Sequence, residues 1–207
     1  MSQSDYTALI HEGAAGAALI FAFHGTGGRA QEVFALARQI APEATVIAPE
    51  GDVSEHGAAR FFRRTGEGVY DMEDLAARTE KMAGFLAAHM VARPERPVHA
   101  FGYSNGANIL ASVMMAQPDL IDRAGLLHPL IPWRPQPVPG LNGREVLITA
   151  GQHDPICPWP ITEALIDWFR DQGATISTEV HGGGHELRPQ ELSALEALLT
   201  PQIEGVR

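Results

Sequence analysis

The chain has 207 residues, of which 45% are hydrophobic, and a formal net charge of −10 at pH 7. We expect a single globular domain over residues 1–207, because this length and apolar share are enough to bury one core. The negative charge argues against binding nucleic acid or an anionic membrane through a basic face. Cys157 is the only cysteine, which excludes an intrachain disulfide and favours a reducing compartment.

Strand-like apolar runs alternate with helical stretches along the chain. Strands are expected at residues 6–10, 18–23, 45–48, 98–103, 123–127, 146–150 and 176–180, and helices at 30–40, 72–91, 105–117, 161–172 and 189–199. This alternation predicts an α/β fold with a mostly parallel, twisted sheet and helices on both faces. The early apolar run over residues 14–23 is too short to span a bilayer and follows no basic segment, so we expect a cytoplasmic protein.

The segment Gly102-Tyr103-Ser104-Asn105-Gly106 lies between a predicted strand and a predicted helix. It has the GxSxG pattern of a nucleophile elbow, in which a serine sits on a sharp strand-to-helix turn. The two glycines are required because a β-carbon at either position would collide with the turn. The pattern predicts that Ser104 is a nucleophile; the alternative is an ordinary small residue in a tight turn.

An elbow serine needs an orienting acid and a base, which follow it in the order Asp or Glu, then His. Asp154 lies just after an apolar strand, in a turn that Pro155 keeps from being helical. It is the expected acid, with an Asx-turn or helix-cap role as the alternative. His185 follows the last predicted strand and is the expected base. Four other histidines compete with it, namely His24, His128, His153 and His181.

The backbone donors of an oxyanion hole are expected from two places. One is the N–H group of Asn105, directly after the nucleophile, and the other is that of Thr26 in the glycine-rich run His24-Gly25-Thr26-Gly27-Gly28. The overlapping run Gly25-Thr26-Gly27-Gly28-Arg29-Ala30 also fits a dinucleotide-binding pattern, with Glu50 about twenty residues after it. An NAD(P)-binding oxidoreductase is therefore a rival hypothesis, but it leaves the serine, aspartate and histidine unexplained.

No metal or cofactor is expected. His181 and His185 have the spacing of a helical zinc pair, but the three glycines between them disfavour a helix and no third ligand is apparent.

The substrate pocket is expected to be shallow. The proline-rich loop over residues 128–144 is too short to form a lid domain. Phe62, Ile156 and Trp159 are candidate pocket residues. For Arg63 and Arg64 a solvated or salt-bridged role is expected.

These motifs together resemble the phospholipase/carboxylesterase group of α/β-hydrolases, which includes acyl-protein thioesterases and dienelactone hydrolases. The resemblance covers nearly the whole chain and is strongest at residues 24–27, 49–51, 102–106, 151–156 and 184–187. Dienelactone hydrolases use cysteine where this chain has Ser104. The resemblance implies a serine esterase without a cofactor, often dimeric in such families.

The predicted function is hydrolysis of small or short-acyl esters through an acyl-enzyme on Ser104. The expected partners are a small-molecule ester as substrate and, as the family resemblance implies, a second copy of the chain in a homodimer. A non-catalytic binding member of the hydrolase fold is a further alternative.

Overall fold

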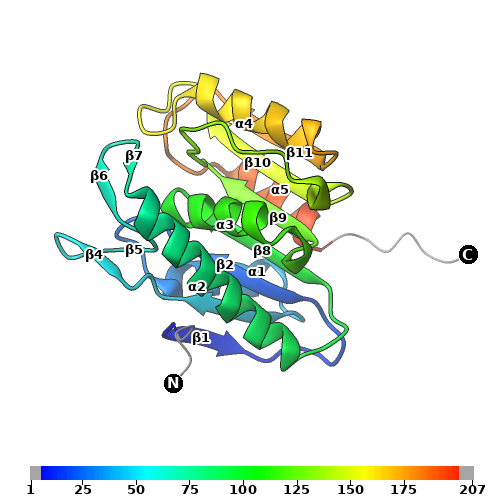
Figure 1. The fold of residues 1–207 in the computed structure, drawn as a ribbon. Helices are drawn as coiled ribbons and strands as arrows, with labels where there is room; N and C mark the ends of the chain where they lie inside the picture. Colours follow the sequence, from blue (N-terminus) through cyan, green and yellow to red (C-terminus); the bar gives the residue numbers. More distant parts are fainter. Residues whose placement is uncertain (1–5, 201–207) are drawn as a thin grey trace, which may run out of the picture.

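The computed structural model describes residues 6–200, and a seven-stranded sheet runs through them (Figure 1). The strands lie in the order β1-β3-β2-β8-β9-β10-β11. Their bounds are β1 Ala8–His11, β2 Leu19–Phe23, β3 Thr45–Pro49, β8 Val98–Tyr103, β9 Arg123–Leu127, β10 Glu145–Gly151 and β11 Thr175–His181. Only β1 runs antiparallel to its neighbour, β3, within this sheet of the described chain. The predicted mostly parallel sheet is confirmed.

Five α-helices in the described chain cover the two faces of this sheet. They are α1 Ala30–Ile40, α2 Met72–Val91, α3 Asn105–Ala116, α4 Trp159–Asp171 and α5 Pro189–Leu199. Helices α2, α3 and α4 lie on the face toward the viewer in Figure 1, and α1 and α5 lie behind the sheet. Two short 3-10 helices, Pro118–Leu120 and Pro139–Leu141, lie in the connections.

Strand β2 is apolar throughout because both of its faces are buried. Its successive side chains point to opposite sides of the sheet. Phe21 and Phe23 pack into the core beneath α2 and α3, whereas Ile20 and Ala22 pack into the core beneath α1 and α5. A continuous apolar run is the pattern expected of a strand in a sheet with two covered faces.

Residues 51–70, expected to be a long loop, form two short hairpins instead. They consist of β4 Val53–Glu55 with β5 Ala58–Arg60, and β6 Arg64–Gly66 with β7 Val69–Tyr70. The first turns at His56 and Gly57, whose φ angles of 51° and 90° suit a tight two-residue hairpin turn. Strands this short leave little periodic signal in a sequence, which is why they were missed.

Other expected boundaries shift only slightly. The first strand begins at Ala8 rather than at residue 6, and α4 begins at Trp159 because Pro160 fits its first turn. The proline-rich residues 128–144 form no lid domain. None of the helices within residues 6–200 combines the length and the hydropathy that crossing a bilayer requires.

Candidate active site

Ser104 lies at the turn between β8 and α3, in the middle of the sheet. Its backbone is strained, with φ 53° and ψ −117°. A β-carbon built at Gly102 would lie 2.4 Å from the backbone carbon of Gly106, and one built at Gly106 would lie 2.4 Å from the carbonyl oxygen of Phe23. The turn therefore requires both glycines, as the GxSxG pattern predicted.

The structure brings Ser104, His185 and Asp154 together in one hydrogen-bonded chain. Nε2 of His185 lies 2.9 Å from Oγ of Ser104, and its Nδ1 lies 2.6 Å from Oδ2 of Asp154. The Asp154 side chain is fully buried, whereas the His185 side chain is 17% exposed. Neutral His185 with its proton on Nδ1 would donate to Asp154 and accept the proton of the serine hydroxyl.

Four hydrogen bonds hold the carboxylate of Asp154. Its Oδ1 accepts the N–H groups of Ile156 and Cys157 at 2.8 and 2.9 Å, while Oδ2 faces His185 and His128 at 2.6 and 3.0 Å. Burial alone would raise the pKa of this carboxyl, but these bonds outweigh it and lower the pKa below its ordinary value. Asp154 thus remains a carboxylate, and its Asx-type bonds accompany the histidine contact rather than replace it.

Thr26 and Asn105 both line the cleft that contains Ser104. Asn105 is the first residue of α3, so its N–H group has no carbonyl partner one turn earlier in the helix. The Thr26 N–H group donates no hydrogen bond to any residue in the described part of the chain. Both amides are therefore free to donate to a ligand in the cleft.

Strand β5 and the residue after it hold both of these amides in place, a contact that the sequence did not predict. The Gly27 N–H group donates to the carbonyl of Ala59 at 2.9 Å, and Nη1 of Arg60 donates to Oγ1 of Thr26 at 2.6 Å. The Phe61 N–H group donates to Oδ1 of Asn105 at 2.8 Å. One short segment thus contacts both residues that supply the candidate oxyanion donors, Thr26 and Asn105.

The same loop does not have the environment of a dinucleotide site. In such sites the pyrophosphate occupies the N-terminus of the helix that follows the glycines. Here the carboxylate of Glu50 occupies that place, because its Oε2 accepts the Ala30 N–H group at 2.8 Å and its Oε1 pairs with Arg29 at 2.8 Å. A bound phosphate would have to displace an anion that the protein itself supplies.

Known proteins with similar sequences and structures include a hydrolase and a carboxylesterase, although no protein-family model matches the chain. The chain is 39% identical over 175 residues, 84% of its length, to "Putative hydrolase MhqD" of Bacillus subtilis (strain 168), of which the match covers 88%. The Bacillus cereus carboxylesterase is 34% identical and superposes with a TM-score of 0.88 over 94% of this chain and 93% of that one. The protein Atu2452 of unknown function from Agrobacterium tumefaciens is 50% identical, with a TM-score of 0.91 over 96% and 98% of the two chains.

The chain belongs to the carboxylesterase group of the α/β-hydrolases. It is accordingly an esterase-type hydrolase. The family resemblance read from the motifs is confirmed, and the oxidoreductase hypothesis is not supported by any of these relatives.

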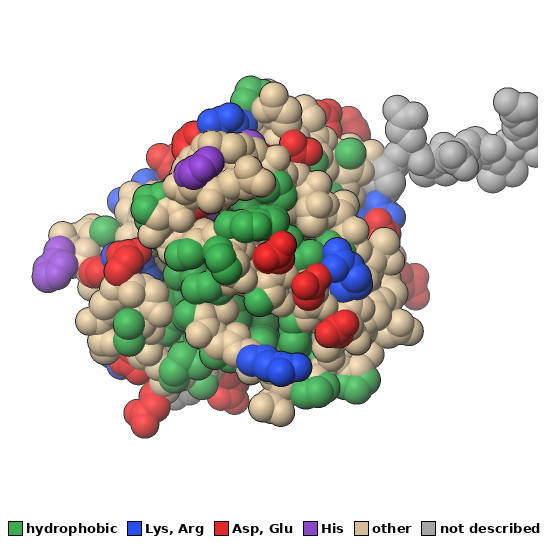
Figure 2. All heavy atoms as spheres, turned by 90° about the horizontal axis from the view of Figure 1, so that it is seen from above, with side chains coloured by type: hydrophobic (Ala, Val, Ile, Leu, Met, Phe, Trp, Pro, Cys, Tyr) green, Lys and Arg blue, Asp and Glu red, His purple; other side chains and the backbone are tan. Residues whose placement is uncertain are grey.

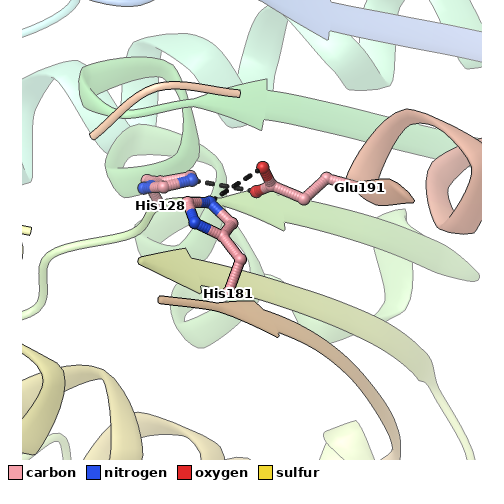
Figure 3. A group of neighbouring side chains, drawn as sticks. All are labelled: His128, His181 and Glu191. Atoms are coloured by element: carbon pink, nitrogen blue, oxygen red, sulfur yellow. Dashed lines mark hydrogen bonds and ion pairs between the residues drawn. The ribbon is translucent and has the colours of Figure 1, made fainter. Parts of the chain in front are cut away.

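In this hydrolase a second group of polar side chains, His128, His181 and Glu191, lies together (Figure 3), and His128 joins it to Asp154. Nδ1 of His128 lies 3.0 Å from Oδ2 of Asp154, and Nε2 lies 2.8 Å from Oε1 of Glu191. Nε2 of His181 lies 3.2 Å from Oε2 of Glu191. From the sequence, His128 is expected only as a rival base, and Glu191 is not among the candidate residues.

His128, His181 and Glu191 also place three potential metal ligands within 4.8 Å of one another. A metal at this point would need unprotonated ring nitrogens facing it. Nδ1 of His181 instead accepts the Gly183 N–H group at 3.0 Å, which puts the proton of the neutral ring on Nε2, facing Glu191. His128 lies between two carboxylates, which favours a proton on each of its nitrogens. These contacts place protons on the ring nitrogens that a metal ion would have to bind. They therefore favour protonated rings over a bound metal ion.

The cleft beside Ser104 is small, with a volume of about 280 Å³. Ile156, a predicted pocket residue, lines it together with Leu130, Tyr70 and Arg64. The Tyr70 hydroxyl donates to the Leu130 carbonyl at 2.8 Å and accepts from Nδ2 of Asn108 at 2.8 Å, which closes this wall. The hairpin β6–β7 thus borders the cleft.

Two predicted pocket residues do not line this cleft in the described structure. Phe62 is fully buried and packs edge-on beneath Tyr70, with ring centroids 4.8 Å apart. Trp159 begins α4 and packs against the core. Phe62 and Trp159 are therefore not among the residues that line the cleft, because the hairpin presents Tyr70 rather than Phe62 to it and Trp159 packs against the core.

Larger hollows lie away from Ser104. A groove of about 800 Å³ lies between α2, α3 and the proline-rich segment, and one of about 560 Å³ lies between that segment and α4. On the face seen in Figure 2, hydrophobic side chains gather centrally, with acidic and basic ones scattered around them. None of the three residues of the hydrogen-bonded chain lines these grooves, so the chemistry and not the size identifies the site.

The arginine pair is salt-bridged, as expected. Nε of Arg63 lies 3.2 Å from Asp71, and Arg64 contacts Glu55 and Glu67 at 3.0 and 2.8 Å. The Arg64 charge in the cleft is therefore compensated by two carboxylates.

Tyr103, the residue directly before Ser104 in the GxSxG motif, also supports the site. Its hydroxyl donates to the carbonyl of His185 at 2.5 Å, so the elbow holds the loop that carries the histidine. Burial raises the pKa of Tyr103 to about 12. The hydroxyl therefore keeps its proton and acts as a donor.

Proposed function

We propose that this hydrolase is a serine carboxylesterase in which Ser104, His185 and Asp154 form the catalytic triad. The observation that carries the proposal is the His185 ring, which bridges a strained elbow serine and a buried carboxylate at 2.9 and 2.6 Å. A non-catalytic member of the fold has no need for a strained serine held against a histidine. The intact chain of bonds therefore favours an enzyme.

The proposed reaction has two halves. Oγ of Ser104 attacks the ester carbonyl while its proton passes to Nε2 of His185, and the carbonyl oxygen becomes an oxyanion. As the C–O bond to the alcohol breaks, His185 returns that proton to the leaving oxygen. Water then attacks the acyl-enzyme in the same way and releases the acid. Asp154 orients the imidazole and stabilises its positive charge in both halves.

Backbone N–H groups of Thr26 and Asn105 are the proposed oxyanion donors. Their contribution is selective for the transition state, because the negative charge on the oxygen exists only there. The hydrogen bonds from Arg60 and Phe61 support this role, since they hold the side chains of Thr26 and Asn105 before the substrate arrives.

Small or short-acyl esters are the proposed substrates. A cleft of about 280 Å³ is small for a ligand site and has room for a short acyl group. The small cleft leaves no room for a long alkyl chain. It also offers no free positive charge from Arg64 to a second anionic group, because Arg64 is already paired with Glu55 and Glu67.

The test is hydrolysis of p-nitrophenyl acetate by the wild-type protein and by Ser104→Ala. The variant is expected to lose activity by a factor on the order of 10⁴ or more, while its circular dichroism and Tm stay close to wild type. A well-folded Ser104→Ala protein with wild-type activity would overturn the proposal.

A further inference from the structure

His128 occupies an unusual position for a residue that is not a glycine. It follows β9 directly and has a φ of 51°, in the left-handed region. Its side chain is completely buried, as are those of Asp154 and Glu191, its two partners. A strained backbone that places a titratable ring between two buried carboxylates points to a specific role for that ring.

The geometry indicates which protons the ring carries. Each nitrogen of His128 lies within 3.0 Å of a carboxylate oxygen, at 3.0 Å for Asp154 and 2.8 Å for Glu191. A neutral imidazole could donate to only one of them and would turn a lone pair toward the other. The imidazolium form donates to both and places a positive charge between two negative ones.

The pKa directions agree with this geometry. Burial alone would lower the pKa of His128, but its hydrogen bonds to Glu191 and Asp154 outweigh burial and raise it. Burial alone would raise the pKa of Glu191, but the bond from His128 and the Arg188 N–H group help to lower it.

In the described part of the chain, no side chain other than Asp154 and Glu191 hydrogen-bonds the ring of His128. Tyr103 on β8 and His185 face it with ring centroids 6.0 and 5.2 Å away, and His181 on β11 lies 5.6 Å away. Sγ of Cys157 donates to the backbone carbonyl of His128, not to its ring.

We propose that His128 and Glu191 are positioning residues that orient Asp154 toward His185, with His128 as an imidazolium that bridges the two carboxylates. His128 and His185 contact the same oxygen, Oδ2 of Asp154. His128 therefore fixes the direction of that oxygen, and the negative charge of Glu191 offsets the positive charge that His128 adds. The three residues keep a net charge of −1 beside His185, the charge that Asp154 alone would supply. The inference rests on the proposed function, because it assigns these residues to the same triad.

The first test observes the protons on the His128 ring directly, in a Ser104→Ala variant that is expected not to hydrolyse substrate. Nitrogen-15 NMR of histidine-labelled Ser104→Ala at pH 7 is expected to show protons on both ring nitrogens of His128, assigned by loss of its signals in Ser104→Ala/His128→Asn. An unprotonated Nε2 would overturn the proposal, and so would a metal-bound one. If Ser104→Ala were fully active, the proposed function would fail while this NMR result still stood.

The second test separates positioning from stability. His128→Asn keeps an amide N–H close to the place of Nδ1 and tolerates a positive φ, whereas His128→Leu has no donor. We expect His128→Asn to keep kcat within about tenfold of wild type and His128→Leu to lose about 10²-fold, with KM unchanged in both. Active-site titration with a fluorophosphonate corrects kcat for unfolded protein.

Substitution of Glu191 gives an independent test of the proposal, and substitution of Glu32 is its matched control. Glu191 also caps α5, since its Oε2 accepts the Arg188 N–H group at 2.7 Å, and Glu32 caps α1 in the same way through the Arg29 N–H group at 3.1 Å. Glu191→Leu is expected to lower kcat by about tenfold, and Glu32→Leu is expected to lower only the Tm. A wild-type kcat per titrated site in His128→Leu and Glu191→Leu would overturn the proposal and leave these residues a structural role alone.

Discussion

Ser104 and His128 both have a positive φ angle, 53° and 51°, and each directly follows one of the neighbouring strands β8 and β9. The Ser104 N–H group donates to the carbonyl of Leu127, the residue before His128, at 2.9 Å. The His128 N–H group donates in turn to the carbonyl of Thr149 on β10, at 3.1 Å. The register of three parallel strands therefore sets the distance between the elbow and the residues around Asp154.

Gly106→Ala tests whether the elbow depends on this close packing. The added β-carbon would lie 2.4 Å from the Phe23 carbonyl oxygen and 2.5 Å from that of His24, and both are backbone atoms at the start of the Thr26 loop. We expect a loss of about 1–3 kcal/mol in the free energy of unfolding and a fall of about 10²-fold in kcat. Urea unfolding and ester hydrolysis measure the two effects.

Gly182→Ala is the matched control, because a β-carbon at Gly182 meets no atom within 4 Å. It should leave both quantities close to wild type. Equal effects of the two substitutions would show that the close contact at Gly106 is not what matters.

The catalytic candidates could be predicted from the sequence because each lies just after a recognisable strand, in an order typical of one fold. Ser104 and Asp154 follow runs that the structure shows as β8 and β10. Glu191 could not be predicted in this way, because it looks like an ordinary first-turn helix carboxylate. Its role depends on how α5 crosses the sheet toward the end of β9, 63 residues earlier in the chain.

The wall of the cleft was harder to predict than its chemistry. Phe62 and Tyr70 both belong to the segment expected to be a loop, and only the hairpin decides which ring faces Ser104. Arg60 was also missed, because its contact with Thr26 joins residues 34 positions apart. The homodimer, the cytoplasmic location and the single domain over residues 1–207 stay predictions.

The buried charges predict how stability depends on pH. The lowered pKa values of Asp154 and Glu191 give stability that is present above their ordinary values of about 4 and is lost as pH falls through their folded values. The raised pKa of His128 gives stability that is complete below its ordinary value of about 6.5 and is lost as pH rises through its folded value.

The Tm difference between wild type and His128→Asn should therefore be largest at about pH 5–6 and should shrink at both higher and lower pH. Thermal unfolding across pH 3–10 measures it. A difference that stays constant over this range would contradict the charged bridge.

Acyl-chain length should be limited by the cleft. Each buried CH₂ contributes about 0.8 kcal/mol only while there is room for it. We expect kcat/KM on p-nitrophenyl esters to peak at roughly two to six carbons. Ile156→Ala should move the peak to longer chains because Ile156 lines the cleft, and Trp159→Phe should not move it. A steady rise to twelve or sixteen carbons would contradict the small cleft.

Cys157 lines the cleft but is not expected to act as a nucleophile. Its thiol is buried and donates to the His128 carbonyl at 3.2 Å, and burial raises its pKa well above the ordinary value. Cys157→Ser should keep kcat/KM within about threefold of wild type, since the hydroxyl can make the same bond. Iodoacetamide at pH 7.5 should leave wild-type activity intact. Inactivation that follows thiol labelling would indicate a cysteine in the chemistry.

The most direct test of the central claim is covalent labelling of the wild-type protein with a fluorophosphonate, followed by mass spectrometry of the peptides. Only a serine that a neighbouring base activates reacts readily with this reagent. We predict one modified residue, Ser104, with loss of esterase activity in proportion to labelling, and little labelling in His185→Ala. Modification of another residue, or full activity in protein labelled at Ser104, would contradict the triad.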